Sequence, residues 1–176
     1  MSSHTLRTFD ERLALRLPML AALLARGFSR LAPRSRIRTA LLWRAARLGL
    51  DAFNRRDLDA VAINYGKDFE YVPARAWVEA GMVEPCYSGL DGYRRYVASV
   101  DEVWGGENYL ALMDVIDEGE QVLLLAHGSM RAQASGVPWS ESFALLLTYG
   151  DGRVIRAREY YDHAEAIAAL RARQPW

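Results

Sequence analysis

Apolar residues along the first third of the chain recur at steps of three and four positions, the spacing of one face of an α-helix. One stripe predicts a helix over residues 8–31 that bends near Pro18. We expect this helix to pack on the rest of the protein through Leu13, Leu17, Leu20 and Leu24. A second stripe predicts a long helix over residues 36–53. Asp57 is predicted to cap the N-terminus of a short helix that ends near residue 64.

Beyond residue 65 the pattern changes to short apolar runs with aromatic residues, separated by turn-forming residues, which predict strands and hairpins. A strand, an irregular segment and a helix that opens at Gly89 come first, followed by four strands and a last helix capped by Asp162. The expected strands are 68–72, 108–116, 121–133, 137–148 and 154–161, and the last helix is 163–171. Clustered helices beside an antiparallel meander predict an α+β fold.

The strand over 121–133 holds four consecutive apolar residues, Leu123 to Ala126. A strand with one face in water should alternate, so this strand must bury both faces. Helices can cover one face, and a second copy of the chain is the simplest cover for the other. We therefore expect a homodimer packed through the outer faces of the strands that contain Leu124 and Leu145.

Composition places the chain among ordinary globular domains, because 51% of its 176 residues are apolar and 25% are charged. The single Cys86 excludes an intramolecular disulfide and a cysteine-based metal site. The formal net charge is zero, which argues against nucleic acid as a partner. The scattered histidines predict no metal site, and no cofactor is expected.

The charge is divided unevenly, with a net +9 over residues 1–56 and −9 over residues 57–176. This pattern predicts a basic helical arm, residues 1–35, that rests on an acidic body, residues 36–176. Contact of the arm with an anionic membrane surface is the alternative. Neither a convincing signal peptide nor an apolar run of membrane-spanning length is present, so we expect a cytoplasmic protein.

Three segments together resemble the SnoaL-like branch of the nuclear transport factor 2-like superfamily. They are LGLDAFNRRDLDAVAINYGKDFEY, YSGLDGYRRYVASVDEVW and YGDGRVIRAREYYDHAEAIAAL. The resemblance covers roughly residues 36–172. It implies a cone-shaped α+β barrel, in which a curved, mainly antiparallel sheet wraps round helices, here with an N-terminal helical arm. Members include isomerases, polyketide cyclases, epoxide hydrolases and proteins without known activity, so the fold alone does not settle the function.

The resemblance also implies a pocket between the concave sheet face and the helices, and it assigns side chains to that pocket. The implied catalytic residues are His127, Glu159 and Tyr161, with His127 and Glu159 as an acid–base pair in one cavity. The implied ligand-binding residues are Phe53, Tyr65, Tyr71, Trp77, Leu125, Ser129, Ala144, Leu146 and Ala157. In the alternative interpretation His127 is a hydrogen-bonded core residue, Glu159 pairs with Arg131, and Tyr161 is a pocket wall.

These residues favour a small-molecule pocket protein whose ligand is apolar, such as a polyketide-, steroid- or terpenoid-like compound. The first hypothesis is a cofactor-independent enzyme that uses acid–base chemistry for cyclisation, isomerisation, dehydration or hydration. The alternatives are a binding protein without catalysis and a protein-interaction module that uses the arm. The sequence does not name the substrate.

Overall fold

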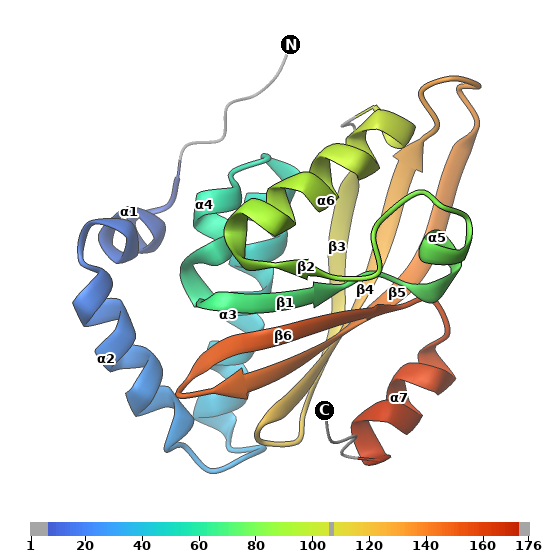
Figure 1. The fold of residues 1–176 in the computed structure, drawn as a ribbon. Coiled ribbons are helices and arrows are strands. Elements are labelled where there is room, and N and C mark those ends of the chain that lie inside the picture. The colour runs from blue at the N-terminus through green and yellow to red at the C-terminus, as the bar shows by residue number, and fades with distance from the viewer. Residues whose placement is uncertain (1–6, 106–107, 173–176) are drawn as a thin grey trace.

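The computed structural model describes residues 7–105 and 108–172 and contains one curved six-stranded sheet with helices packed on both faces (Figure 1). The helices are α1 (Phe9–Arg16), α2 (Pro18–Ser29), α3 (Arg36–Asn54), α4 (Leu58–Val61), α5 (Arg75–Glu79), α6 (Gly89–Trp104) and α7 (His163–Ala172), with a 3₁₀ turn at Ala62–Asn64. The strands are β1 (Tyr65–Val72), β2 (Tyr87–Ser88), β3 (Tyr109–Asp117), β4 (Gln121–Arg131), β5 (Pro138–Gly150) and β6 (Arg153–Tyr160).

The strand order is β2-β1-β6-β5-β4-β3, in which β1 and β6 are parallel and the other described pairs are antiparallel. This arrangement confirms the predicted α+β fold with a curved, mainly antiparallel sheet. The segment 73–88, expected to be irregular, holds the short helix α5 and the two-residue strand β2.

Helix α3 lies against the concave face because its apolar stripe is buried in the core and its C-terminal end is hydrogen-bonded to β3. Leu42, Ala46 and Leu50 recur at four-residue steps and are buried in the main core. At the C-terminal end, the Asn54 side chain donates a 2.9 Å hydrogen bond to the Leu110 carbonyl and accepts a 2.8 Å bond from the Leu110 N–H. This paired contact ties the end of α3 to β3.

The outer face of the sheet is covered in part by α7, which follows β6 and is capped by Asp162 as predicted. The outer-face residues Leu123, Ala144 and Leu146 form a second apolar cluster with α7. Leu124 and Leu145 belong to the inner core, so the expectation that they form an outer dimer interface is wrong. Both faces of the apolar strand β4 are covered within one chain, by α3 and α6 on one side of the sheet and by α7 on the other. The homodimer stays a prediction.

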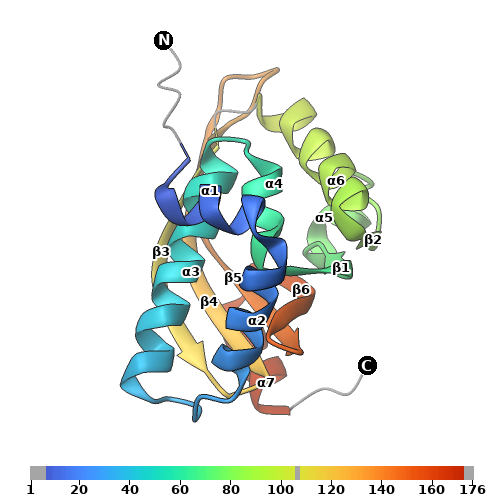
Figure 2. The same cartoon turned by 90° about the vertical axis from the view of Figure 1, so that its left-hand side faces the viewer.

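The described part of the arm, residues 7–35, forms α1 and α2, which meet at Leu17 and lie beside α3 (Figure 2). The predicted bend is confirmed, because Pro18 occupies the first position of α2, where its missing N–H has no helical partner to lose. The expectation that a leucine stripe buries itself on the body is wrong. Leu17, Leu20 and Leu24 are 46%, 41% and 65% exposed.

Among the described residues, no helix combines the length and the apolar character that crossing a membrane requires.

Candidate functional site

A small chamber lies between the concave sheet face and helices α3 and α6. Its volume is about 80 Å³, which is room for a few water molecules and far less than a typical ligand pocket. Most of its walls are aliphatic or aromatic side chains, and Glu159 supplies the carboxyl group. The walls include Leu42, Leu50, Phe53, Tyr65, Tyr71, Trp77, Tyr93, Tyr96, Leu124, Phe143, Leu145, Leu147 and Tyr149.

Glu159 is only 6% exposed and points inward from β6, where it pairs in register with Leu145 of β5. Its Oε2 accepts a hydrogen bond of 3.1 Å from the Tyr96 hydroxyl and one of 3.3 Å from the Ala74 N–H. A longer contact of 3.5 Å joins the same oxygen to the Tyr71 hydroxyl. Three separate elements, β1, the segment before α5 and α6, therefore hold one carboxyl group.

Burial raises the pKa of Glu159 above its ordinary value of 4.5, because the charged form loses the solvation that water would supply. The Ala74 N–H and the hydroxyls of Tyr96, Tyr161 and Tyr71 act in the opposite direction and lower the pKa, but burial dominates. A carboxyl with a raised pKa is a stronger base than an ordinary carboxylate, which suits it to proton transfer.

The tyrosines around Glu159 stay protonated and act as donors. Burial raises the pKa values of Tyr71 and Tyr96 well above 10, and the negative charge of Glu159 raises both further. Burial likewise raises the pKa of Tyr65, which lines the same chamber, to about 12. The chamber thus combines one titratable carboxyl with neutral hydroxyl donors.

The raised pKa of Glu159 predicts that Glu159→Gln removes a pH dependence of stability. Above about pH 4.5 the unfolded carboxyl ionises before the folded one, so the folded state binds more protons and wild-type stability falls until the folded pKa is passed. Urea unfolding between pH 4.5 and 8 should show a relative gain for Glu159→Gln of at most about 1.4 kcal/mol per pH unit. Glu141→Gln, at an exposed position of β5, is the matched control. Parallel curves for wild type and Glu159→Gln would contradict the raised pKa.

The structure places the predicted site residues in two groups. Phe53, Tyr65, Tyr71 and Trp77 line the chamber with Glu159, and Ala157 lies in the same core, paired with Tyr71 across β1 and β6. His127, Leu125, Ser129, Ala144 and Leu146 lie on the opposite face of the sheet. The prediction that these five residues face the cavity is wrong. The reason is that Leu124, which pairs with Leu145, points inward and sets the alternation of β4 and β5.

His127 is therefore separated from Glu159 by the sheet, and the expected acid–base pair does not form. The His127 ring lies between two serines of β5, with Nε2 2.8 Å from the Ser140 hydroxyl and Nδ1 3.4 Å from the Ser142 hydroxyl. The alternative, in which Glu159 pairs with Arg131, is also wrong, since the Arg131 guanidinium donates to the Gly136 carbonyl.

Tyr161 belongs to an aromatic group at one end of the chamber. Its ring stacks on Trp77 with centroids 5.8 Å apart and meets Trp139 edge-on at 5.7 Å. Burial and the charge of Glu159 raise the pKa of Tyr161, so its hydroxyl is a neutral donor close to the carboxyl. The structure thus brings together Glu159 and Tyr161 of the three predicted catalytic residues, and leaves out His127.

Sequence reasoning missed the contribution of α6 to the site. Neither Tyr93 nor Tyr96 is among the site residues that the resemblance implies. Their three-residue spacing places both rings on the core-facing side of α6, stacked 5.9 Å apart. A buried carboxyl requires donors, so a search for buried hydroxyls opposite Glu159 would have identified Tyr96.

The fold and the chamber together define a nuclear transport factor 2-like protein fold, the cone-shaped α+β barrel. A structure of a nuclear transport factor 2-like protein of unknown function from Burkholderia pseudomallei is similar, with a TM-score of 0.61, 23% identity, and coverage of 72% of this chain and 94% of that chain. TerC crystallised with polyporic acid gives a TM-score of 0.60 and 21% identity, with coverage of 73% and 96%. A candidate SnoaL-like polyketide cyclase from Jannaschia sp. gives a TM-score of 0.60 and 17% identity, with coverage of 81% of this chain and 98% of that chain.

These similarities support the fold that the resemblance implied. No protein-family model matches the chain, and no curated protein matches it.

Proposed function

We propose that the protein is a cofactor-independent enzyme in which Glu159 moves a proton on an apolar carbonyl or hydroxyl compound. The observation that carries the proposal is a buried carboxyl with a raised pKa that lines a chamber and faces protonated tyrosines. The similar folds of a candidate polyketide cyclase and of candidate isomerases support this class of reaction.

The simplest step for these groups is removal of a proton from the carbon next to a carbonyl. The Glu159 carboxylate takes the proton, the C–H electron pair moves into a carbon–carbon double bond, and the carbonyl oxygen becomes an enolate oxygen. The hydroxyls of Tyr96 and Tyr161 are placed near the carboxyl and would donate hydrogen bonds to that oxygen. Return of the proton to the same or to a conjugated carbon completes an exchange or an isomerisation.

Exchange of α-protons on 2-butanone and 2-undecanone in D₂O, followed by NMR, tests the proposal without knowledge of the natural substrate. Wild-type protein should accelerate the exchange, and Glu159→Gln should lower the rate by about 100-fold, the usual contribution of a positioned base. Tyr96→Phe should lower it less, because Tyr161 remains. Glu102→Gln, at an exposed position of α6, should leave it unchanged.

Equal exchange by wild type and Glu159→Gln on both ketones would overturn the catalytic proposal. The protein would then be a binding protein, in which the tyrosines serve to satisfy a structural carboxyl. Hydrogen bonds from Tyr96 and Ala74, which satisfy Glu159 without any ligand, are the observation that favours this second function.

A further inference from the structure

A much larger hollow lies next to the Glu159 chamber, between the arm and the body. Its volume is about 700 Å³, within the range of small-molecule sites. The hollow follows α2, whose twelve residues extend about 18 Å. Its walls are mostly aliphatic and include Leu13, Leu17, Leu20, Leu23, Leu24, Leu31, Leu41, Leu48 and Ile63.

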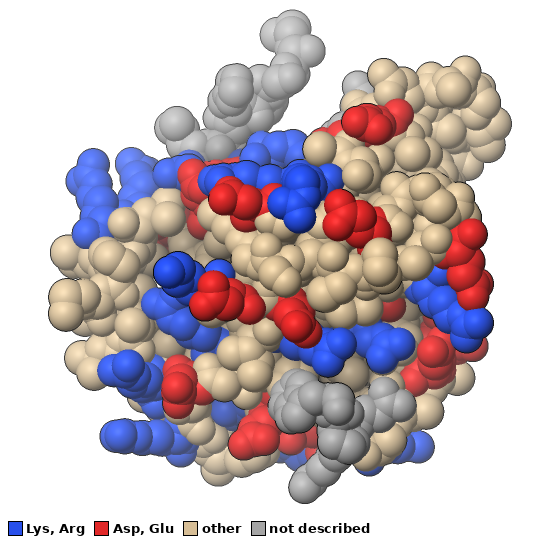
Figure 3. Space-filling view, in the orientation of Figure 1, with Lys and Arg blue, Asp and Glu red and all other residues tan. Residues whose placement is uncertain are grey.

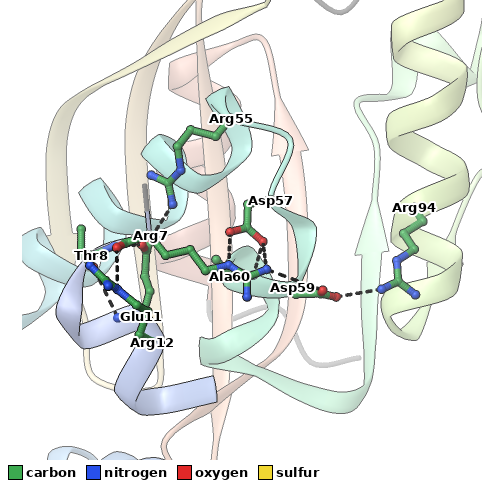
Figure 4. Close-up of polar contacts among 9 residues, drawn as sticks. All are labelled: Arg7, Thr8, Glu11, Arg12, Arg55, Asp57, Asp59, Ala60 and Arg94. Carbon is green, nitrogen blue, oxygen red and sulfur yellow. Dashed lines mark hydrogen bonds and ion pairs between the residues drawn. The ribbon is translucent and has the colours of Figure 1, made fainter. Parts of the chain in front are cut away.

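The arm contacts the body at both of its ends, so it crosses over the hollow without filling it. At the N-terminal end, Glu11 and Arg55 form a buried ion pair of 2.7 Å, and Arg7 reaches Asp57 (Figure 4). At the C-terminal end, the Phe28 ring packs 6.2 Å from the ring of Tyr149.

Between these anchors the leucines of α2 face the hollow and remain partly exposed. In the space-filling view the edge formed by the arm shows an uncharged patch bordered by basic side chains (Figure 3). Exposed apolar surface of this kind, which the anchors of the arm leave uncovered, marks a binding site.

Gly49 indicates that a ligand can pass between the hollow and the chamber. It lies in the interior of α3, where glycine destabilises a helix relative to alanine. Nothing lies within 4 Å of the position that a Cβ would take, so no neighbour requires glycine. Five residues, Gly49 among them, line both spaces: Leu42, Ala45, Gly49, Asn64 and Tyr149. The smallest side chain therefore stands at the wall shared by the two spaces.

The charged residues at the hollow are already neutralised. Asp10 pairs with Arg44, and Glu11 pairs with Arg55. The polar groups at the shared wall are the Asn64 amide and the Tyr149 hydroxyl, and burial raises the pKa of Tyr149, which keeps it neutral. A ligand with a free charge would find no partner there, so the site favours a neutral molecule.

We propose that the arm and α3 bind the hydrocarbon chain of a neutral, long-chain aliphatic ketone, aldehyde or alcohol, whose oxygen-bearing end passes Gly49 into the Glu159 chamber. The assignment of the polar end rests on the proposed function, whereas the assignment of the chain to the hollow does not. Mostly aliphatic walls along the length of α2 and the absence of a free charge among the described lining residues favour this class over an ionic ligand.

Calorimetric titration with decan-1-ol tests the hollow without any reaction. Wild type should bind decan-1-ol, and Gly49→Phe, which fills the shared wall, should bind it at least tenfold more weakly. Gly49→Ala should retain most of the affinity, since a methyl group enters open space. Ala40→Phe, at an exposed position of α3 that lines neither space, is the control and should bind like wild type.

Equal affinity of Gly49→Phe and wild type for decan-1-ol would overturn the inference. Absence of binding to wild type would also overturn it, and if exchange on 2-butanone still depended on Glu159, the proposed function would stand. Conversely, decan-1-ol binding that depends on Gly49 could occur without any acceleration of α-proton exchange, even by wild type. The binding site in the hollow would then stand, and the proposed function would fail. Sedimentation with phosphatidylglycerol vesicles that depends on Leu20 and Leu24, without decan-1-ol binding, would assign the leucines to a membrane and overturn the inference.

Discussion

Replacement of Arg38 by methionine should destabilise the protein by about 3–5 kcal/mol, because it leaves a buried carboxylate without its counter-ion. The Arg38 and Asp117 side chains are 4% and 3% exposed, and Nε lies 2.8 Å from Oδ2. The Asp117 carboxylate also accepts from the N–H groups of Arg34 and Gly119, so it cannot turn to water without breaking these bonds. The pair fixes the start of α3 to the turn between β3 and β4.

Urea unfolding of Arg38→Met and Arg44→Met measures this effect against an exposed pair. Arg44 bonds to Asp10 at the surface, and its loss should cost no more than about 1 kcal/mol. The double variant Arg38→Met/Asp117→Asn should recover part of the loss, because no charge then remains buried. A loss for Arg38→Met as small as that for Arg44→Met would show that the buried pair adds nothing.

The fold was predictable because its elements carry strong local signals. The four-residue stripe of α3, the cap at Asp57 and the glycine-containing turns define where each element begins and ends. The order of these elements then leaves few arrangements, and the similarity of the chain to known members of the fold selects one. Alternation along β6 left two possible faces, and the resemblance to the family placed Ala157 and Glu159 correctly on the inner one.

The site was predicted only in part because β4 and β5 are apolar on both faces. Leu123, Leu124 and Leu125 are chemically alike, so hydrophobic alternation cannot choose which side chains point inward. The choice depends on α7, which covers Leu123 and Leu146, and no pattern in the strand itself reports the position of that helix. An error of one residue moved His127 to the wrong side of the sheet.

The arm illustrates the same limit at the level of tertiary packing. A leucine stripe predicts a helix and an apolar face, and α1 and α2 confirm the helices. The stripe cannot tell whether the face meets protein or a ligand, because both bury leucine equally well. Here the anchors at Glu11 and Phe28, which are polar and aromatic, decide where the arm lies.

Gly152→Ala should release the C-terminal part of the arm and destabilise the protein by about 3–4 kcal/mol. Gly152 has a φ of +79°, and a Cβ there would lie 2.0 Å from the carbonyl oxygen of Ala25. Backbone atoms cannot yield as a flexible side chain would, so α2 must move away from the turn between β5 and β6. That movement separates Phe28 from Tyr149 and adds the loss of their packing to the strain of the left-handed backbone.

Gly136→Ala provides the control, because Gly136 has a similar φ of +68° and nothing lies within 4 Å of its Cβ position. Both variants bear the backbone strain, about 1–2 kcal/mol, and only Gly152→Ala also displaces the arm. Urea unfolding should separate them, and limited trypsin digestion should cut Gly152→Ala faster at Arg26 and Arg30, since the released arm exposes these bonds. If the two variants unfold alike and are cleaved at equal rates, the hairpin does not hold the arm, and the hollow beneath α2 has no fixed wall on that side.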